Sequence, residues 1–205
     1  MTAKVRERSD ARDNRERIVA VARAAFAADG LEVPIREIAR RAGVGPATVY
    51  RHFPTKQALF SAAFADGMTL CSDIVAEGLT AADPWDGFAF VIARLLEVHA
   101  LNRGLSQAFT SALEGAGLLD AERERTLTQL LQLIRRAREA GALRADFVLE
   151  DALLVLMANE GIRAVSAEQR AAASRRFAEL VLQSFRAHPS AEPLPPPVRL
   201  PLPAR

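Results

Sequence analysis

The residues best suited to chemistry lie in one short stretch, residues 36–53, with the sequence REIARRAGVGPATVYRHF. It holds four arginines, one histidine and one tyrosine. Guanidinium and hydroxyl groups bond phosphates, and a guanidinium can also bond the edge of a guanine, so the stretch indicates contact with nucleic acid. The alternative is an ordinary solvated helical surface, which is the favoured interpretation for Arg40 and Arg41.

The rest of the chain offers little material for catalysis or metal binding. The single Cys71 excludes an internal disulfide, and the three histidines, His52, His99 and His188, sit in unrelated contexts. Cys71 has no evident histidine partner in the sequence, and no glycine-rich phosphate loop is present. A helical small-molecule enzyme is therefore the less favoured alternative. We expect no catalytic residue, no cofactor and no metal site.

Charge is distributed unevenly along the chain. Residues 1–60 hold 12 Lys and Arg against 7 Asp and Glu, a balance of +5, whereas residues 61–205 hold 15 against 18, a balance of −3. A basic first segment followed by a mildly acidic remainder indicates that the N-terminal part binds a polyanion and that the rest does not. Scattered charge in an arginine-rich composition is the alternative.

Hydropathy indicates a soluble chain. No run approaches the eighteen or more apolar residues of a membrane span, and the first seventeen residues are charged where a signal peptide needs an apolar segment. We therefore expect a cytoplasmic protein with no membrane partner.

Apolar residues recur at spacings of three and four almost throughout, and alternating β-branched runs are absent, which predicts an all-α fold. Seven of the last 18 residues are proline, which predicts a disordered or polyproline II tail, untethered rather than bound to a partner. The predicted domains are residues 1–60, residues 61–188 and the tail, residues 189–205. Helices are predicted at residues 14–29, 34–42, 46–53, 56–79, from 83 onward, 106–113, 120–140, 149–164 and 168–187.

Two of these helices, 34–42 and 46–53, are short and joined by a tight turn with glycine, the pattern of a helix-turn-helix. Gly43 fits the left-handed conformation of the turn, and Ala39 is small where the two helices must approach. Val49 and Phe53, four residues apart, are predicted to face the core. The side chains left on the other faces are Ala47, Thr48, Tyr50, Arg51 and His52.

The segment DGLEVPIREIARRAGVGPATVYRHFPTKQALF resembles the DNA-binding domain of the TetR family of bacterial transcriptional regulators. The shared features are a glycine after the first helix, then IA, AGV, T-V-Y and F-x-x-K, and the resemblance covers residues 14–64. The remainder is similar to the family in length and helix count only. The resemblance implies an N-terminal helix-turn-helix domain followed by a helical dimerisation and ligand-binding domain. It also implies a homodimeric repressor, released from a double-stranded DNA operator by a small-molecule effector.

The resemblance implies roles for individual residues of the motif. Thr48, Tyr50 and His52 match positions that contact the phosphate backbone, as does Lys56 at the start of the fourth helix. Arg36 matches a position that can read a base, and base or methyl contacts are expected from Pro46, Ala47 and Arg51. Pro34 departs from the family pattern, where threonine is usual, so a hydroxyl contact to phosphate is lost and the helix cap must come from elsewhere.

An effector pocket and a dimer interface are expected in residues 61–188. The candidate pocket residues are aromatic, sulfur-containing or polar, with ordinary core packing as the alternative for most of them: Trp85, Phe88, His99, Gln107, Phe109, Met157, Asn159 and Glu160. The helices at 149–164 and 168–187 have apolar faces suited to a four-helix interface between two copies, or to packing within one chain. A nucleoid-type DNA binder without an effector is a further alternative.

Overall fold

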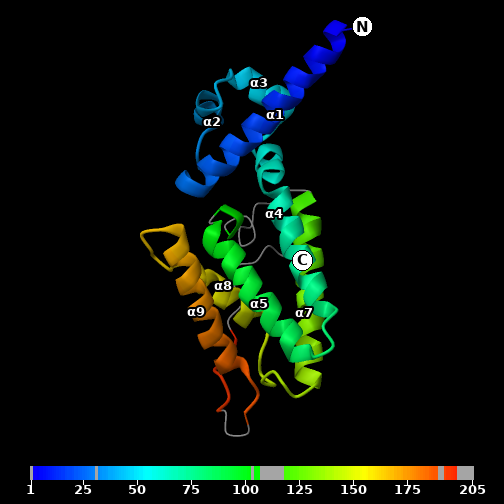
Figure 1. The fold of residues 1–205 in the computed structure, drawn as a ribbon, viewed down its shortest axis with the longest axis vertical. Coiled ribbons are helices and arrows are strands. Elements are labelled where there is room, and N and C mark those ends of the chain that lie inside the picture. Colours follow the sequence, from blue (N-terminus) through cyan, green and yellow to red (C-terminus); the bar gives the residue numbers. More distant parts are fainter. Residues whose placement is uncertain (1, 31, 103, 107–117, 189–191, 198–205) are drawn as a thin grey trace.

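The computed structural model describes residues 2–30, 32–102, 104–106, 118–188 and 192–197, and among them it contains helices and no β-strand. The predicted all-α fold is therefore confirmed (Figure 1). The helices are α1 (Thr2–Asp29), α2 (Ile35–Arg41), α3 (Pro46–His52), α4 (Lys56–Leu79), α5 (Pro84–Leu101), α7 (Leu118–Glu139), α8 (Leu149–Glu160) and α9 (Ala167–Phe185). Only the first residue of the helix predicted at 106–113 lies within the described residues, in the helical turn 104–106.

The helices α1, α2 and α3 form one end of the molecule, and α4 runs from them into the bundle of α5, α7, α8 and α9 (Figure 1). An aromatic cluster joins α1 to α4: the Phe26 ring lies 5.5 Å from that of Phe60 and 6.2 Å from that of Phe64, between centroids. The Arg23 guanidinium also donates to the carbonyl oxygen of Ala63 at 2.7 Å. Burial of these rings fixes the N-terminal end on α4.

The bundle has its own aromatic core near the start of α5. The Phe88 ring packs on Phe147 and Phe185 with centroid distances of 5.4 and 6.4 Å, and those two rings lie 4.7 Å apart. Trp85 completes the cluster at 5.8 Å from Phe88. These residues come from α5, from the loop before α8 and from the end of α9, so their burial holds the base of the bundle together.

Helix α4 is long and apolar enough, by length and composition, to cross a membrane. It packs against α1, α5 and α7, and half of its most apolar window is buried. A core helix shared between the two ends of a molecule has this same composition, because it must be apolar on more than one side.

Two helix boundaries differ from the prediction by four residues or more, whereas the others agree within two residues. Helix α1 begins at Thr2 instead of residue 14, because residues 2–13 contain neither proline nor glycine and charge pairs such as Arg12 with Glu16 (2.9 Å) support a polar helix. Helix α8 ends at Glu160 instead of residue 164, because Gly161 closes it and the Ser166 hydroxyl then caps α9.

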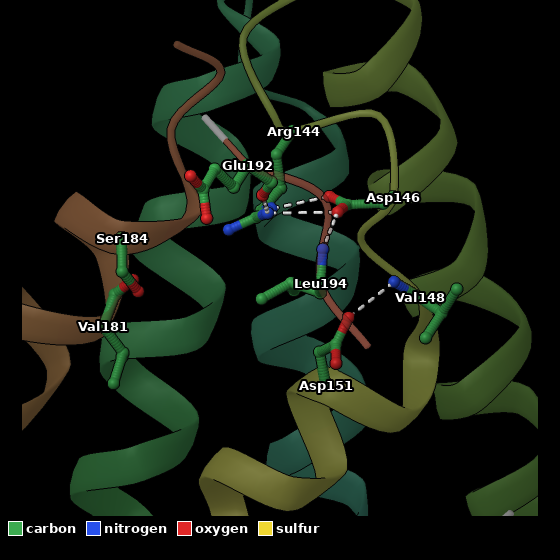
Figure 2. A network of polar contacts seen from close by, with 8 residues as sticks. All are labelled: Arg144, Asp146, Val148, Asp151, Val181, Ser184, Glu192 and Leu194. Atoms are coloured by element: carbon green, nitrogen blue, oxygen red, sulfur yellow. Dashed lines mark hydrogen bonds and ion pairs between the residues drawn. The ribbon is translucent and has the colours of Figure 1, made fainter. Parts of the chain in front are cut away.

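The proline-rich tail is tethered where the structure describes it, contrary to the predicted untethered segment (Figure 2). The Arg144 guanidinium donates to the Glu192 carbonyl oxygen at 3.0 Å and to the Asp146 carboxylate at 2.6 and 3.0 Å. The same carboxylate accepts from the Leu194 backbone N–H at 2.9 Å. Residues 192–197 are non-helical, as their prolines require, yet they lie against the loop before α8.

Asp146→Asn should release this tail and lower the stability of the protein at neutral pH, with less effect in acid. The Arg144 guanidinium, and then the Leu194 N–H, lower the pKa of Asp146 from 3.8 to about 2. A lowered carboxyl pKa contributes stability above pH 4 that is lost as the pH falls towards 2. Because the side chain is about one-third exposed, we expect a loss of only about 1 kcal/mol at pH 7. Urea unfolding gives the energy, and faster proteolytic trimming of the C-terminus would report the release. Unchanged trimming would contradict it.

Candidate DNA-binding surface

The turn between α2 and α3 has the geometry that the sequence predicts. Gly43 has a φ of +65°, and the Gly43 and Val44 N–H groups donate to the carbonyl oxygens of Arg40 and Ala39 at 3.2 and 3.0 Å. Gly45 caps α3 and Pro46 occupies its first turn. The left-handed residue reverses the chain within three positions, so α3 can lie across α2.

The inner face of this helix pair is fully buried. Ile38, Ala39 and Val49 are 0% exposed, and Phe53 is 3% exposed. The predicted core side of the motif is confirmed. Its burial against α1 fixes which side chains of α3 are left on the outside.

The outer face presents most of the residues predicted to contact DNA. Arg36, Pro46, Ala47, Tyr50 and Arg51 are exposed, and Tyr50 is 51% exposed despite its aromatic ring. An exposed aromatic residue among cations is typical of a contact surface. Three further predicted residues, Thr48, His52 and Lys56, are half-buried.

Lys56 lies at the first position of α4. The Thr55 hydroxyl accepts from the Ala58 N–H at 3.0 Å and caps this helix. A cation beside the amide groups of a helix start is an arrangement suited to a phosphate.

Two arginines of the motif are paired with carboxylates instead of being available to DNA. Arg40 donates to both Glu37 oxygens, at 2.8 and 2.7 Å, and Arg41 lies 2.6 Å from Asp29 and 2.8 Å from Glu37. Hydrogen bonds from Arg40 and Arg41 lower the pKa of Glu37 to about 2. Among the described residues, the ion pairs of α2 involve these two arginines and not Arg36. The solvated-face interpretation of Arg40 and Arg41 fits this pairing.

Pro34 takes the cap position of α2 instead of its first turn, and no side chain caps the helix there. The Pro34 carbonyl oxygen accepts from the N–H groups of Glu37 and Ile38 at 3.0 and 3.3 Å. These backbone hydrogen bonds therefore take the place of the cap that a threonine would give, and no other side chain replaces it.

Two arginines of α1 outside the predicted contact residues support the motif. Arg15 lies with its guanidinium carbon 5.2 Å from the centre of the Phe53 ring, and Arg17 donates to the Ala42 carbonyl oxygen at 3.0 Å. The signal available in the sequence was the run of arginines at spacings of two and three just before the first apolar residue, Ile18.

The residues predicted to line an effector pocket do not share one place. Trp85 and Phe88 belong to the aromatic core at the start of α5, whereas His99 is near its end, about 21 Å from Trp85 at 1.5 Å per residue. Asn159 is buried near His99 and donates to the Leu96 carbonyl oxygen at 2.8 Å. Met157 is 40% exposed on α8. Phe109 and Gln107 lie outside the described residues, and Glu160 is half-buried.

Two open grooves on the described surface contain none of these residues. One, of about 420 Å³, lies between α5 and α9 and is lined by Arg94, Glu97 and Arg175 among others. The other, of about 710 Å³, lies between α7 and residues 147–150. Neither groove therefore supports the predicted pocket set.

Cys71 does have a histidine partner, so the sequence interpretation was wrong on this point. Its Sγ lies 3.6 Å from His99 Nε2, and His99 Nδ1 lies 2.8 Å from the Ser106 hydroxyl. The three residues are buried where α4, α5 and residues 104–106 meet. Burial raises the pKa of the Cys71 thiol to about 12, so the sulfur stays protonated and is a poor nucleophile. The pair therefore does not favour an enzyme.

His99→Gln should flatten the pH dependence of stability. Burial lowers the pKa of His99 from 6.5 to about 4, so between these values the unfolded chain takes up a proton that the folded chain does not. Stability therefore falls as the pH drops below 6.5, by up to about 1.4 kcal/mol per pH unit from this one group. Chemical unfolding at pH 5.5 and 7.5 measures the difference. The exposed His188→Gln is the control, and an equal pH slope in the wild type and both variants would exclude the effect.

Known proteins resemble the chain over both ends of the molecule. A model described as bacterial regulatory proteins of the tetR family matches residues 18–63, and one described as the C-terminal domain of SbtR-like transcriptional regulators matches residues 83–187. No curated protein gives a significant match.

Solved structures agree with the family models. A TetR regulatory protein from Mycobacterium vanbaalenii is 34% identical, with a TM-score of 0.50, covering 87% of this chain and 98% of that one. The regulator SCO0520 from Streptomyces coelicolor is 27% identical, with a TM-score of 0.52 and coverage of 84% and 98%. AibR, solved with isovaleryl coenzyme A and operator DNA, is 16% identical, with a TM-score of 0.63 and coverage of 84% and 97%. The helix-turn-helix, the family models and the 34% identical structure together show that the chain belongs to the TetR family of bacterial transcriptional regulators.

Proposed function

We propose that the protein is a cytoplasmic, homodimeric repressor that binds a palindromic DNA operator and leaves it when a small-molecule effector binds. The observation that carries the proposal is the outer face of α2 and α3. Arg36 of α2 is exposed, as are Tyr50 and Arg51 of α3. Arg40 and Arg41, also on α2, are held by carboxylates. Free guanidinium groups on a recognition helix and its partner are suited to guanine edges and phosphates.

Exposed apolar side chains on the last two helices support a dimer. Leu154 and Met157, one turn apart on α8, are 56% and 40% exposed, and Leu180 on α9 is 55% exposed. Burial of apolar side chains of this size against a second copy stabilises the dimer. Two copies also place two helix-turn-helix units on half-sites about 34–36 Å apart, which multiplies the affinity of each.

Effector release requires that the ligand favour a dimer geometry in which the two recognition helices no longer fit one DNA face. The fold can hold both kinds of partner, since AibR was solved with an acyl coenzyme A and DNA together.

The proposal is tested by selecting, over several rounds, the sequences of a random DNA library that bind the purified protein. The affinity for the most enriched sequence is then measured as the salt concentration is increased. We expect a palindrome with two half-sites and loss of its binding in Tyr50→Ala and Lys56→Ala. No enriched sequence, with weak binding that disappears at modest salt, would overturn it in favour of nonspecific attraction. With the operator in hand, effectors are screened by loss of DNA affinity in a protein that stays folded.

A further inference from the structure

The buried polar side chains of the bundle lie in one layer. In the part of the chain that the structure describes, they are Ser72, His99, Ser106, Thr126, Asn159 and Ser174. His99 of α5 contacts Ser106 at 2.8 Å and Cys71 of α4 at 3.6 Å. The next residue of α4, Ser72, has its hydroxyl 3.5 Å from Gln129 Oε1 on α7, one turn from Thr126. Three helices therefore contribute polar groups at the same level.

Helices α8 and α9 add Asn159 and Ser174 to this polar layer. Asn159 of α8 donates to the Leu96 carbonyl oxygen near the end of α5, at 2.8 Å. On α9, the Arg175 guanidinium donates to Glu97 at 3.1 Å, so the adjacent Ser174 lies level with Leu96. The polar layer thus crosses the bundle at the end of α5 opposite to the aromatic core.

Two oxygen atoms of the polar layer are buried without a hydrogen bond. Asn159 Oδ1 and Ser174 Oγ have no partner among the described groups, although their side chains are only 1% and 0% exposed. Thr126 differs, because its hydroxyl donates to the Glu122 carbonyl oxygen at 2.9 Å. A buried oxygen left unpaired costs free energy, so such atoms typically mark the place of a bound water or ligand. Both oxygens can accept a hydrogen bond, and the serine hydroxyl can also donate one.

The polar layer is uncharged. Among the described residues, none of its buried side chains is a carboxylate, a lysine or an arginine. Burial lowers the pKa of His99 to about 4, so its imidazole is neutral near pH 7. An ion placed here would lose its hydration without gaining a counter-charge, which is costly. The buried Leu96 and Leu156 beside Asn159 are suited to an apolar ligand body.

We infer that the effector is a small neutral organic molecule with an apolar body and a hydroxyl or amide group that donates to Asn159 Oδ1 and Ser174 Oγ. The inference rests on the proposed function and adds the binding residues and the chemical class of the ligand. It separates this effector from anionic ligands, which need a buried cation. A molecule of this class satisfies both unpaired oxygens and places no charge in the bundle.

The position of the polar layer suits an effector that controls DNA binding. Residues 104–106 contact His99 on one side and the N-terminal end of the molecule on the other. A Cβ atom on Gly104 would lie 2.6 Å from the Phe64 ring on α4 and 3.2 Å from the Ala27 Cα on α1. With so little free space, a ligand that displaces this segment also displaces α1 or α4, and so changes the placement of the recognition helix.

The test measures binding of small probes to the full-length protein without DNA. Benzyl alcohol and benzamide are neutral donors, benzyl methyl ether and N,N-dimethylbenzamide lack the donor, and benzoate carries a negative charge. We expect the two donors to bind the wild type most tightly in NMR titrations. Ser174→Ala should weaken their binding about 2- to 10-fold through the loss of one hydrogen bond. The second variant, Asn159→Leu, should weaken it further, because the other acceptor is lost as well.

Ser184→Ala is the matched control on the same helix. The Ser184 hydroxyl is exposed and donates to the Val181 carbonyl oxygen at 2.7 Å, so its removal should leave probe binding unchanged. Ser174→Ala removes an unpaired buried hydroxyl, so we expect the variant to be at least as stable as the wild type in urea. Weaker binding by a protein of undiminished stability assigns the loss to the missing contact.

The outcomes separate this inference from the proposed function. If neither donor binds, or if both bind wild type and Ser174→Ala equally, the polar layer holds water alone and the inference fails. Tightest binding by benzoate would overturn it as well. These results leave the operator selection untouched. A protein that selects no operator fails the proposed function, whether or not it binds these probes.

Discussion

Gly87→Ala should destabilise the protein by about 3 kcal/mol or more, although alanine is the better helix former. Helices α4 and α5 cross where Gly78 faces Gly87. A Cβ atom at Gly87 would lie 2.3 Å from the Gly78 carbonyl oxygen and 3.1 Å from the Ala81 Cβ, and one at Gly78 would lie 2.3 Å from Val91 Cγ2. A backbone carbonyl cannot rotate away from such a contact, so the two helices must separate and lose packing along their length.

Gly161→Ala is the matched control, because Gly161 has a φ of −69° and the nearest atom to its added Cβ is 3.1 Å away. We expect its stability to stay within about 1 kcal/mol of the wild type. For Gly87→Ala, a loss of about 3 kcal/mol corresponds to a melting temperature roughly 6–12 °C lower in a chain of this size. Urea unfolding and thermal scans measure both. A Gly87→Ala protein as stable as Gly161→Ala would mean that the helices do not approach this closely.

The helix-turn-helix could be predicted because its signals are local. Gly43 for the turn, Pro46 for the first turn of α3 and the apolar spacing of Val49 and Phe53 all lie within one short stretch and agree with one another. Helix α4 was predicted at both ends for the same reason, since Thr55 caps it and its apolar period is unbroken. Which arginines remain free was not predictable, because Asp29 reaches Arg41 only through the packing of α1 on α2.

Features that depend on distant parts of the chain were missed. Cys71 and His99 are 28 residues apart and meet only because α4 packs on α5 at that level. The proline-rich tail was predicted to be non-helical from composition, yet its anchor, Arg144, lies 48 residues before Glu192 and gives no sign of the contact in the sequence. The first turns of α1 lack apolar periodicity, so the rule that locates buried helices did not find them.

Arg36→Ala should lower affinity for the selected operator about 100-fold or more, without lowering the melting temperature. A guanidinium that bonds a guanine edge in two places is worth about 1–3 kcal/mol, and a homodimer loses the contact in both half-sites. Arg36 is exposed on α2, so its removal leaves the buried face of the motif intact. Arg51→Ala on α3 should act in the same way. Titration of a labelled operator measures the affinity, and repeated library selection should show that one base pair in each half-site is no longer specified.

The matched control is Arg40→Ala, which removes the same charge from the same helix. Arg40 is already held by Glu37 and its side chain is 72% exposed, so we expect less than about a threefold change in affinity. The comparison distinguishes base reading from general attraction, because both substitutions lower the positive charge near DNA by the same amount. Equal losses for Arg36→Ala and Arg40→Ala, with unchanged sequence preference, would mean that the surface attracts phosphate only. A loss confined to Arg36→Ala, with preference relaxed at one base pair, requires that its guanidinium reach into the groove.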